Sequence, residues 1–289
     1  MTRSTVARAH GTSAKTRRRA LVTGKHAVLI TLSLFMLFPI ILAVSSALKT
    51  RADVRSNPFG LFSSFSFESL TRAWTLGNFG EYLGNTFVLA VPSTIIVVAL
   101  SAMAGYAFAK LPFRGRTPLY YLVIVGLLVP FFTYMIPLYF QLQGMGLLDT
   151  LPGVILVMAS TGLAFGTVFM RAFFSDLPPE LEQAARIDGA SEFQIFLKIA
   201  MPLVSSGAGA LAVFTFLQNW NNLLIPLLFL PGGAFRPLTL GLYLFAGGRS
   251  IDIGPLAAGT LITILPVIVL FVVLQRQVTQ GILSGAVKG

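Results

Sequence analysis

Side chains able to do acid–base or metal chemistry are few in this sequence. Four carboxylates, Asp176, Glu180, Glu182 and Asp188, lie close together in one segment. Paired carboxylates could hold a metal ion or exchange protons in a membrane-embedded transferase. The chain has no Cys, and its two His lie within the first 26 residues, so thiolate chemistry is excluded and no His is near these acids in the sequence. The enzyme interpretation therefore depends on the four carboxylates alone.

A second polar cluster, residues 218–222, consists of uncharged amides around an indole. Its members are Gln218, Asn219, Trp220, Asn221 and Asn222. Amide groups beside Trp could line a path for a sugar. Amides also join transmembrane helices, at about 0.6 kcal/mol per hydrogen bond, so packing is the other interpretation. Both remain open at this point.

Charged residues are absent from the interiors of the long apolar runs. Proton- and sodium-coupled carriers generally need buried ionisable groups, so ion coupling is disfavoured and a neutral solute is compatible. The phosphate-binding pattern Gly-x-x-x-x-Gly-Lys-Ser/Thr does not occur. We therefore expect no cofactor in this chain and an energy source on a partner.

The elements that must position these residues are membrane-spanning helices. Hydrophobic residues make up 55% of the 289 positions and charged residues only 11%, against about a quarter in soluble domains. A helical crossing needs about 20 apolar residues. Six uncharged runs are longer than that: 26–48, 82–109, 117–148, 150–170, 199–235 and 253–275. We expect an all-α, polytopic fold with six transmembrane helices.

Basic residues predict the orientation of these helices. Residues 1–25 contain seven Lys and Arg and no acid, which favours a cytoplasmic N-terminus. Six spans then return the C-terminus to the cytoplasm, with 15 basic residues inside and 6 outside. We expect a multi-pass protein of a bacterial plasma or inner membrane that contacts lipid and no nucleic acid. Residues 1–25 are expected to be a disordered tail and residues 26–289 the transmembrane domain.

The first run could instead belong to a cleaved signal peptide, because three consecutive Arg precede it at 17–19. The apolar part of a signal peptide has about 7 to 15 residues, whereas this run has 23. We therefore expect a retained helix.

The acidic segment, 175–202, has the periodicity of two short amphipathic helices. The expected apolar stripes are Leu177, Leu181, Ala184 and Ala185 in the first helix, and Phe193, Phe196, Leu197 and Ala200 in the second. Gly189 can end the first helix, and Ser191 with Gln194 has the spacing of a capping box for the second. Pro202 is expected to separate the pair from the fifth run.

The same segment resembles a motif of known permeases. The inner-membrane permeases of binding-protein-dependent ABC importers carry Glu-Ala-Ala, three residues, Gly, nine residues and Ile-x-Leu-Pro. Here residues 183–185 read Gln-Ala-Ala, Gly189 follows, and residues 199–202 read Ile-Ala-Met-Pro, with the family's spacing. Further matches to the carbohydrate subfamily, typified by the smaller permease of the maltose transporter, are residues 106–115, 220–221, 281 and 285–289. The resemblance covers the chain from about residue 28 onward.

This resemblance implies a type I ABC importer permease that imports sugar together with a second permease subunit. It further implies an extracytoplasmic sugar-binding protein and an ATP-binding subunit dimer that carries ATP and magnesium and receives the helix pair. The residues expected to couple the chain to that dimer are Glu182, Gln183, Ala184, Ala185, Asp188, Gly189, Ile199 and Pro202. Gln183 replaces the usual Glu of the motif, and Glu182 could supply the missing charge.

An outer loop completes the expectations from the resemblance. Gly232, Gly233, Ala234 and Phe235 would project into the binding protein, although the two Gly would serve an ordinary turn equally well. A related permease for glycerol phosphate or another polyol derivative is the nearer alternative. An anionic substrate would favour basic residues along the path, and the span interiors contain none.

Overall fold

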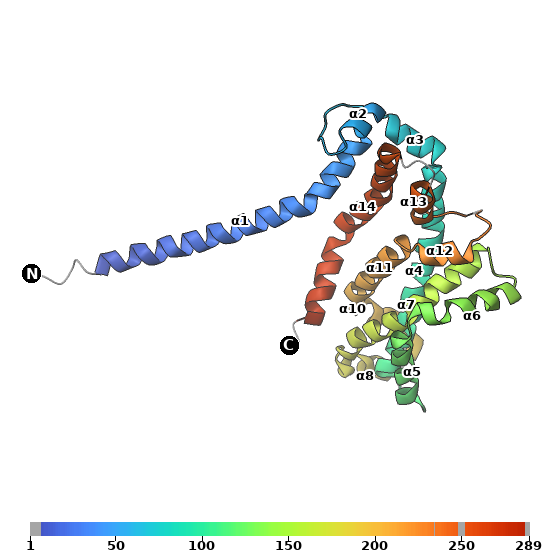
Figure 1. The fold of residues 1–289 in the computed structure, drawn as a ribbon. Coiled ribbons are helices and arrows are strands. Elements are labelled where there is room, and N and C mark those ends of the chain that lie inside the picture. Colours follow the sequence, from blue (N-terminus) through green and yellow to red (C-terminus); the bar gives the residue numbers. More distant parts are fainter. Residues whose placement is uncertain (1–6, 234, 248–251, 287–289) are drawn as a thin grey trace, which may run out of the picture. The chain divides into compact units, whose positions relative to one another are not determined.

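The computed structural model describes residues 7–233, 235–247 and 252–286. Every regular element in these ranges is a helix, which confirms the expected all-α fold (Figure 1). The chain divides into two compact units. The first contains Met1–Arg72 and Asp252–Leu261, and the second contains Ala73–Ile251 and Ile262–Gly289.

The first unit begins with helix α1 (Ala7–Ala47), which contains the first predicted span as Val22–Ala47. The tail expected to be disordered is helical here from Ala7 onward. Its Ala, Arg and Lys residues are good helix formers, and they extend a helix whose nucleation cost is already met. Residues 1–6 lie outside the described residues.

Polar contacts join the remaining parts of the first unit. Helix α2 (Arg51–Ser56), helix α3 (Glu68–Leu76) and the start of helix α14 (Ile253–Ala286) meet at the Asp252 carboxylate. It lies 3.1 Å from Arg51 Nε and 2.8 Å from Arg72 Nη1. The fully buried Lys49 donates hydrogen bonds to the carbonyl oxygens of Asn57 (2.5 Å) and Gly60 (2.7 Å).

Four stretches of helix are long and apolar enough to cross a membrane, among the residues described. They are Val22–Ala47, helix α4 (Phe79–Lys110), helix α7 (Leu151–Ser175) and Ile253–Val273. Each coincides with one of the predicted runs.

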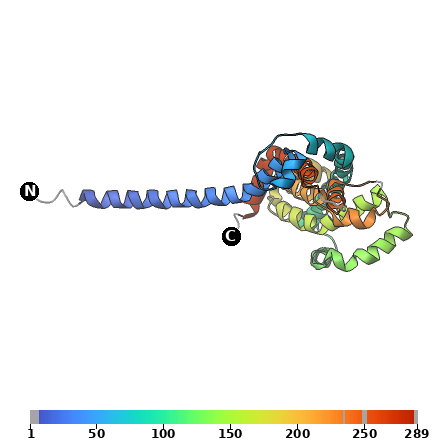
Figure 2. The same ribbon diagram turned by 45° about the horizontal axis from the view of Figure 1, so that its top comes forward.

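The third and fifth predicted runs form bent pairs of helices. Helix α5 (Arg116–Leu128) and helix α6 (Phe131–Gly144) meet at 99° around Pro130. The two green helices run in different directions in Figure 2. Proline disfavours helical backbone at the preceding residue, and Val129 is extended accordingly. With each bent pair counted as one span, the described residues contain up to six, in agreement with the prediction.

The fifth run is bent near its beginning, and its helix ends early. A segment consisting of α9 (Glu192–Ile195), a π-helix (Phe196–Ala200) and α10 (Met201–Leu203) meets α11 (Ser205–Trp220) at 77°. Two shorter helices, α12 (Leu224–Phe229) and α13 (Leu238–Ala246), follow.

The core of the second unit lies where α4 packs along α7 and α11. Small residues allow this close approach. A Cβ added at Gly105 of α4 would lie 2.8 Å from both Met170 Cβ and the Arg171 backbone nitrogen. A Cβ at Gly166 of α7 would collide with the Ser101 side chain.

Candidate functional site

The acidic segment forms the two short helices that its periodicity predicts. Helix α8 (Pro179–Ile187) is followed by Gly189 in the left-handed conformation, with φ of 84°. Ser191 and Gln194 form a reciprocal capping box at the start of α9: the Gln194 N–H donates to Ser191 Oγ (3.4 Å), and the Ser191 N–H donates to Gln194 Oε1 (2.9 Å). Both capping predictions are confirmed.

One side of this helix pair is buried in the chain's own core. Ala185 packs with Ile195, Phe196 and Ala200 against Phe174 of α7. Met170 of α7 and Tyr106 of α4 belong to the same hydrophobic cluster, and Ile199 packs against it. The helix pair is therefore seated on the ends of α4 and α7.

The predicted apolar stripes are only partly correct. Ala185, Phe196 and Ala200 are buried, but Leu181, Ala184, Phe193 and Leu197 are exposed. Helix α8 has apolar residues on both sides, and the buried side is the one that also carries Glu182. Its outer side presents Leu181, Ala184 and the 86% exposed Ile187, a set we call the α8 outer surface.

A buried ion pair joins α8 to the end of α4. Lys110 Nζ lies 3.2 Å from Glu182 Oε1 and donates a hydrogen bond to the Leu177 carbonyl oxygen (2.7 Å). Both charged side chains are less than 10% exposed. The suggestion that Glu182 supplies a surface charge in place of the motif's Glu is wrong, because its carboxylate is held inside the chain by Lys110.

A second ion pair links the two short helices to each other. Arg186 lies 2.6 Å from Glu192 Oε1 through Nε and 3.2 Å from Oε2 through Nη2. The Tyr106 hydroxyl also donates to Glu192 Oε2, at 3.4 Å. Hydrogen bonding to Arg186 lowers the pKa of Glu192 below its usual value, so this carboxylate stays ionised throughout the neutral range.

The other predicted coupling residues differ in accessibility. Gln183, Ala184, Asp188 and Gly189 are exposed, and Ile199 is partly buried. Ala185, which the resemblance assigned to a contact with the ATPase, faces the chain's own core instead.

Pro202 is exposed and lies inside α10, so it does not end the helix as expected. The break follows at Val204. Proline lacks an N–H and clashes with the carbonyl four residues earlier, which here belongs to Lys198. The wider π-helical turn at Phe196–Ala200 includes Lys198 and ends two residues before Pro202.

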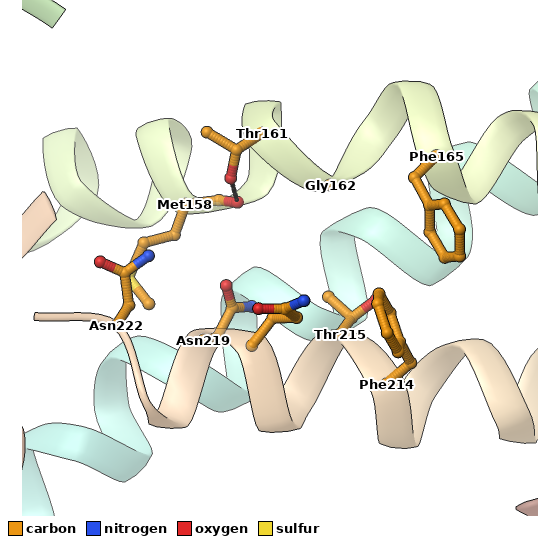
Figure 3. Close-up of a pocket in the computed structure, with 9 residues that line it drawn as sticks. Met158, Thr161, Gly162, Phe165, Phe214, Thr215, Asn219 and Asn222 are labelled. Atoms are coloured by element: carbon orange, nitrogen blue, oxygen red, sulfur yellow. Dashed lines mark hydrogen bonds between the residues drawn. The ribbon is translucent and has the colours of Figure 1, made fainter. Parts of the chain in front are cut away.

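A cavity of about 370 Å³ lies between α7 and α11 (Figure 3). Its lining combines amides and hydroxyls with apolar side chains and contains no charged residue. The lining residues are Met158, Thr161, Gly162, Phe165, Phe214, Thr215, Gln218, Asn219 and Asn222. Three members of the predicted amide cluster therefore line this cavity.

The two threonines of this lining were not among the residues predicted from the sequence. Thr161 is on α7, where its hydroxyl donates to the Met158 carbonyl oxygen (2.8 Å, Figure 3). Thr215 precedes Gln218, Asn219 and Asn222 at the spacing i, i+3, i+4 and i+7. That helical spacing could have identified Thr215.

Trp220 and Asn221 lie outside the cavity lining. Trp220 is fully buried, and its Nε1–H donates to the Thr263 carbonyl oxygen (3.1 Å). Asn221 donates to the Leu217 carbonyl one turn back (2.9 Å), while Asn219 also donates to Thr94 Oγ1 of α4 (3.4 Å). The sugar-platform interpretation of Trp220 is therefore wrong, and the packing interpretation holds for it.

The loop that follows α12, expected on the outer side, is tied to the turn between α6 and α7. The Gly232 N–H donates to Asp149 Oδ1 (3.0 Å), and a Cβ at Gly232 would collide with that carboxylate. Gly233 has a φ of 72°, as a turn glycine requires. Phe235 is 36% exposed, and Ala234 lies outside the described residues. Asp149 was not predicted from the sequence as a partner of this loop.

The carboxylates that could have suggested an enzyme do not converge. Within the part of the chain that the structure describes, no three His, Cys, Asp or Glu side chains form a group that could hold a metal ion. Glu182 is committed to Lys110 and Arg186. The Glu182 carboxylate therefore has a structural role in the acidic segment.

Known proteins are similar to this chain in sequence. The model of a family described as "binding-protein-dependent transport system inner membrane component" matches residues 97–283. A diacetylchitobiose uptake system permease protein of Streptomyces coelicolor is 34% identical over 97% of this chain and 93% of its own length. A trehalose transport system permease protein of Mycobacterium tuberculosis is 32% identical over 91% of this chain and 97% of its own.

A solved structure shows the same fold at lower sequence identity. It is a crystal structure of a bacterial ABC transporter involved in the import of the acidic polysaccharide alginate. One of its chains aligns with a TM-score of 0.82 and 23% identity, covering 89% of this chain and 96% of that one.

Proposed function

This chain belongs to the family of binding-protein-dependent transport system inner membrane components, and on that premise we propose that it is a permease subunit of an ATP-driven sugar importer. Relatives named for diacetylchitobiose and trehalose support a carbohydrate as the solute. Glycerol phosphate is not favoured, because the lining of the α7–α11 cavity has no basic residue to balance a phosphate. A membrane-embedded transferase is not favoured either, because the relatives are transport permeases.

The observation that carries the coupling step is the two-sided helix α8. Its inner side is fixed to α4 and α7 by Ala185 and by the Lys110–Glu182 ion pair. Its outer surface leaves Leu181, Ala184 and Ile187 exposed for an ATP-binding subunit. A partner bound to this outer surface would move α4 and α7 together with α8, because α8 is joined to both helices by close packing and by the Lys110–Glu182 ion pair.

The same arrangement sets an energetic requirement. Moving a two-state pathway from 1:99 to 99:1 needs about 5.5 kcal/mol of differential binding. The ATP-binding subunit dimer, which would carry ATP and magnesium, supplies this energy through the helix pair. Packing of Ala185, Ile195 and Phe196 against α7 makes the pair stiff enough for that role.

The solute path runs beside the amides of α11. Gln218, Asn219 and Asn222 can bond the hydroxyls of a neutral sugar without a charged group. A second permease subunit would close the open side of this cavity. On the outer side, the loop of Gly232, Gly233, Ala234 and Phe235 would meet the sugar-binding protein, with the Asp149 contact holding its base.

The proposal requires α8 in the cytoplasm, and a labelling experiment tests this. The chain has no Cys, so single thiols at Ala184 and at the exposed Met145 can be compared without background. An impermeant maleimide applied to intact cells should label Met145→Cys and leave Ala184→Cys unlabelled until the cells are lysed. Equal labelling of the two variants in intact cells would refute the orientation.

A binding experiment then tests the coupling. In inverted membrane vesicles, the co-expressed ATP-binding subunit should protect Ala184→Cys from the maleimide. Removal of that subunit should restore labelling. If protection does not depend on the subunit, the α8 outer surface is not its docking site.

A further inference from the structure

A second cavity, of about 210 Å³, lies at the end of the bundle where α4 ends and α5 begins. It is lined by Phe108, Arg116, Thr117, Tyr120, Tyr121 and Arg171. These residues come from α4, α5 and α7, all within the second unit. Neither the coupling site nor the α7–α11 cavity includes any of them.

The two arginines of this cavity have no acidic partner in the part of the chain that the structure describes. Five other basic side chains form ion pairs: Lys49, Arg51, Arg72, Lys110 and Arg186. Among the described residues, Arg116 and Arg171 form none, although both are partly buried. A partly buried charge without a counter-ion is costly, so this pair of charges favours an anion in the cavity.

Both arginines are held in place by contacts that leave most of their donors unused. Arg171 Nε donates to the Phe108 carbonyl (3.3 Å), and its guanidinium carbon lies 4.0 Å from the centre of the Tyr120 ring. Arg116 Nη2 donates to the Ala109 carbonyl (3.0 Å). Each guanidinium has five N–H donors in a fixed fork, a geometry that matches a phosphate group.

Two further features of the same cavity favour an anion. Helix α5 begins at Arg116, and no side chain caps its N-terminus, where the helix dipole is positive. Thr117 and Tyr121 add neutral hydroxyl donors to the lining. The lining thus combines guanidinium and hydroxyl groups beside the positive end of the α5 dipole, a combination that is common at phosphate sites.

The position of the cavity makes lipid head groups one source of such a group. It lies where three apolar runs end, and at that depth the phosphates of lipid head groups are concentrated. Basic pockets between transmembrane helices bind such head groups. We propose that this cavity binds a phosphate group, supplied by an anionic phospholipid or by free phosphate. The proposal is independent of the imported solute.

Native mass spectrometry of the delipidated full chain with its co-purified subunits tests the proposal. Phosphatidylglycerol is titrated against the native chain, Arg116→Gln, Arg171→Gln and the double variant. Each single variant should lose roughly tenfold in affinity, the usual effect of one charge-assisted hydrogen bond. Arg114→Gln, an exposed neighbour outside the lining, is the matched control and should bind as the native chain does.

Inorganic phosphate separates the two sources. If millimolar phosphate displaces phosphatidylglycerol, the cavity takes free phosphate; if it does not, the lipid is the ligand, and either result supports a phosphate site. Unchanged lipid affinity in the double variant would overturn the proposal, as would an equal loss in Arg114→Gln. Loss of a partner subunit from the double variant with lipid retained would also overturn it, since the arginines would then bind a protein carboxylate.

The variants differ in their risk of misfolding. Arg171 contacts both Phe108 and Tyr120, so Arg171→Lys, which retains the charge, is included and should bind between the native chain and Arg171→Gln. Arg116 contacts one backbone carbonyl, and Arg116→Gln should therefore keep the native melting temperature. Arg116→Gln alone decides the outcome if Arg171→Gln fails to fold.

Discussion

At the scale of single residues, the helix pair depends on charges that the chain uses internally. Glu182 and Lys110 are both nearly inaccessible to solvent, whereas Gln183 beside them is exposed. Neighbouring positions of one motif therefore have opposite roles. Glu182 holds α8 to α4, and Gln183 faces any partner.

Replacing Lys110 with Ala should strongly destabilise the helix pair. Removal of one partner from a buried ion pair leaves an uncompensated charge, at a cost of about 3–5 kcal/mol. Thermal unfolding of the purified importer should show a clearly lower melting temperature. Lys198→Ala, which removes an exposed Lys from the π-helix Phe196–Ala200, should have little effect. Similar melting of the two variants would contradict the importance of the Lys110–Glu182 pair.

Gln183→Glu restores the usual residue of the motif and should leave sugar uptake intact or slightly raised. The side chain is exposed, so the new carboxylate stays hydrated and costs little. Uptake of labelled sugar by cells expressing the variant measures this. A collapse of uptake at unchanged expression would show that the partner surface rejects a negative charge at this position.

Acid should weaken the Arg186–Glu192 link between α8 and α9. The pKa of Glu192 is lowered in the folded chain by its hydrogen bonds to Arg186. Its stabilising contribution is therefore complete above the usual Glu pKa and disappears as pH falls through the lowered value. The melting temperature of Glu192→Gln should be lower than that of the native chain at neutral pH, and the difference should vanish in acid. A constant difference across this range would contradict the expected titration.

At the scale of elements, glycine decides how closely α4 and α7 pack. Gly105 faces the backbone of α7 at Met170 and Arg171, with no space for a Cβ. Gly84, on the same helix, has nothing within 4 Å of its added Cβ. The two glycines of α4 thus differ in physical role although they lie on the same helix.

Gly105→Ala should separate α4 from α7 and lower the melting temperature of the importer. The overpacking cost is about 1–3 kcal/mol, partly offset by the better helix propensity of Ala. Gly84→Ala should be neutral or slightly stabilising, because only the propensity changes. Equal melting temperatures for the two variants would show that α7 adjusts without cost.

At the scale of the whole molecule, the family of this chain implies partner subunits, and the α8 outer surface is the surface that we propose for one of them. The α8 outer surface carries exposed apolar side chains away from the region expected to contact lipid. Exposed apolar patches of this kind are typical of protein contacts. In the proposed coupling, the packed inner side of α8 would pass a displacement of this outer surface on to α4 and α7.

Ile187→Ser should uncouple the importer without unfolding it. Ile187 is 86% exposed, so the substitution removes no internal packing, whereas an anchor residue at an interface can contribute about 2 kcal/mol or more. We expect at least a tenfold loss of sugar-stimulated ATPase activity at an unchanged melting temperature. Met145→Ser, at another exposed apolar residue, is the control and should retain stimulation. Full stimulation in Ile187→Ser would exclude this surface from coupling.

The local sequence was sufficient to predict where the spans and several helix ends lie. The uncharged runs predicted the spans, because charge is costly in lipid. Gly189 and the Ser191–Gln194 pair predicted the helix ends, because capping depends on neighbouring residues. The amide cluster predicted part of the cavity lining, because Gln218, Asn219 and Asn222 share one helical face.

Which side of each helix is buried was decided only by the tertiary structure. Helix α8 has apolar residues on both sides, and the contact between Glu182 and Lys110, 72 positions apart in the sequence, selects the inner one. Trp220 lies beside the cavity amides in the sequence, yet its indole turns into the core to reach Thr263. The cavity of Arg116 and Arg171 likewise joins distant segments. Which side chain is buried depends on the packing energies between segments that are far apart along the chain. A local sequence pattern does not contain that information.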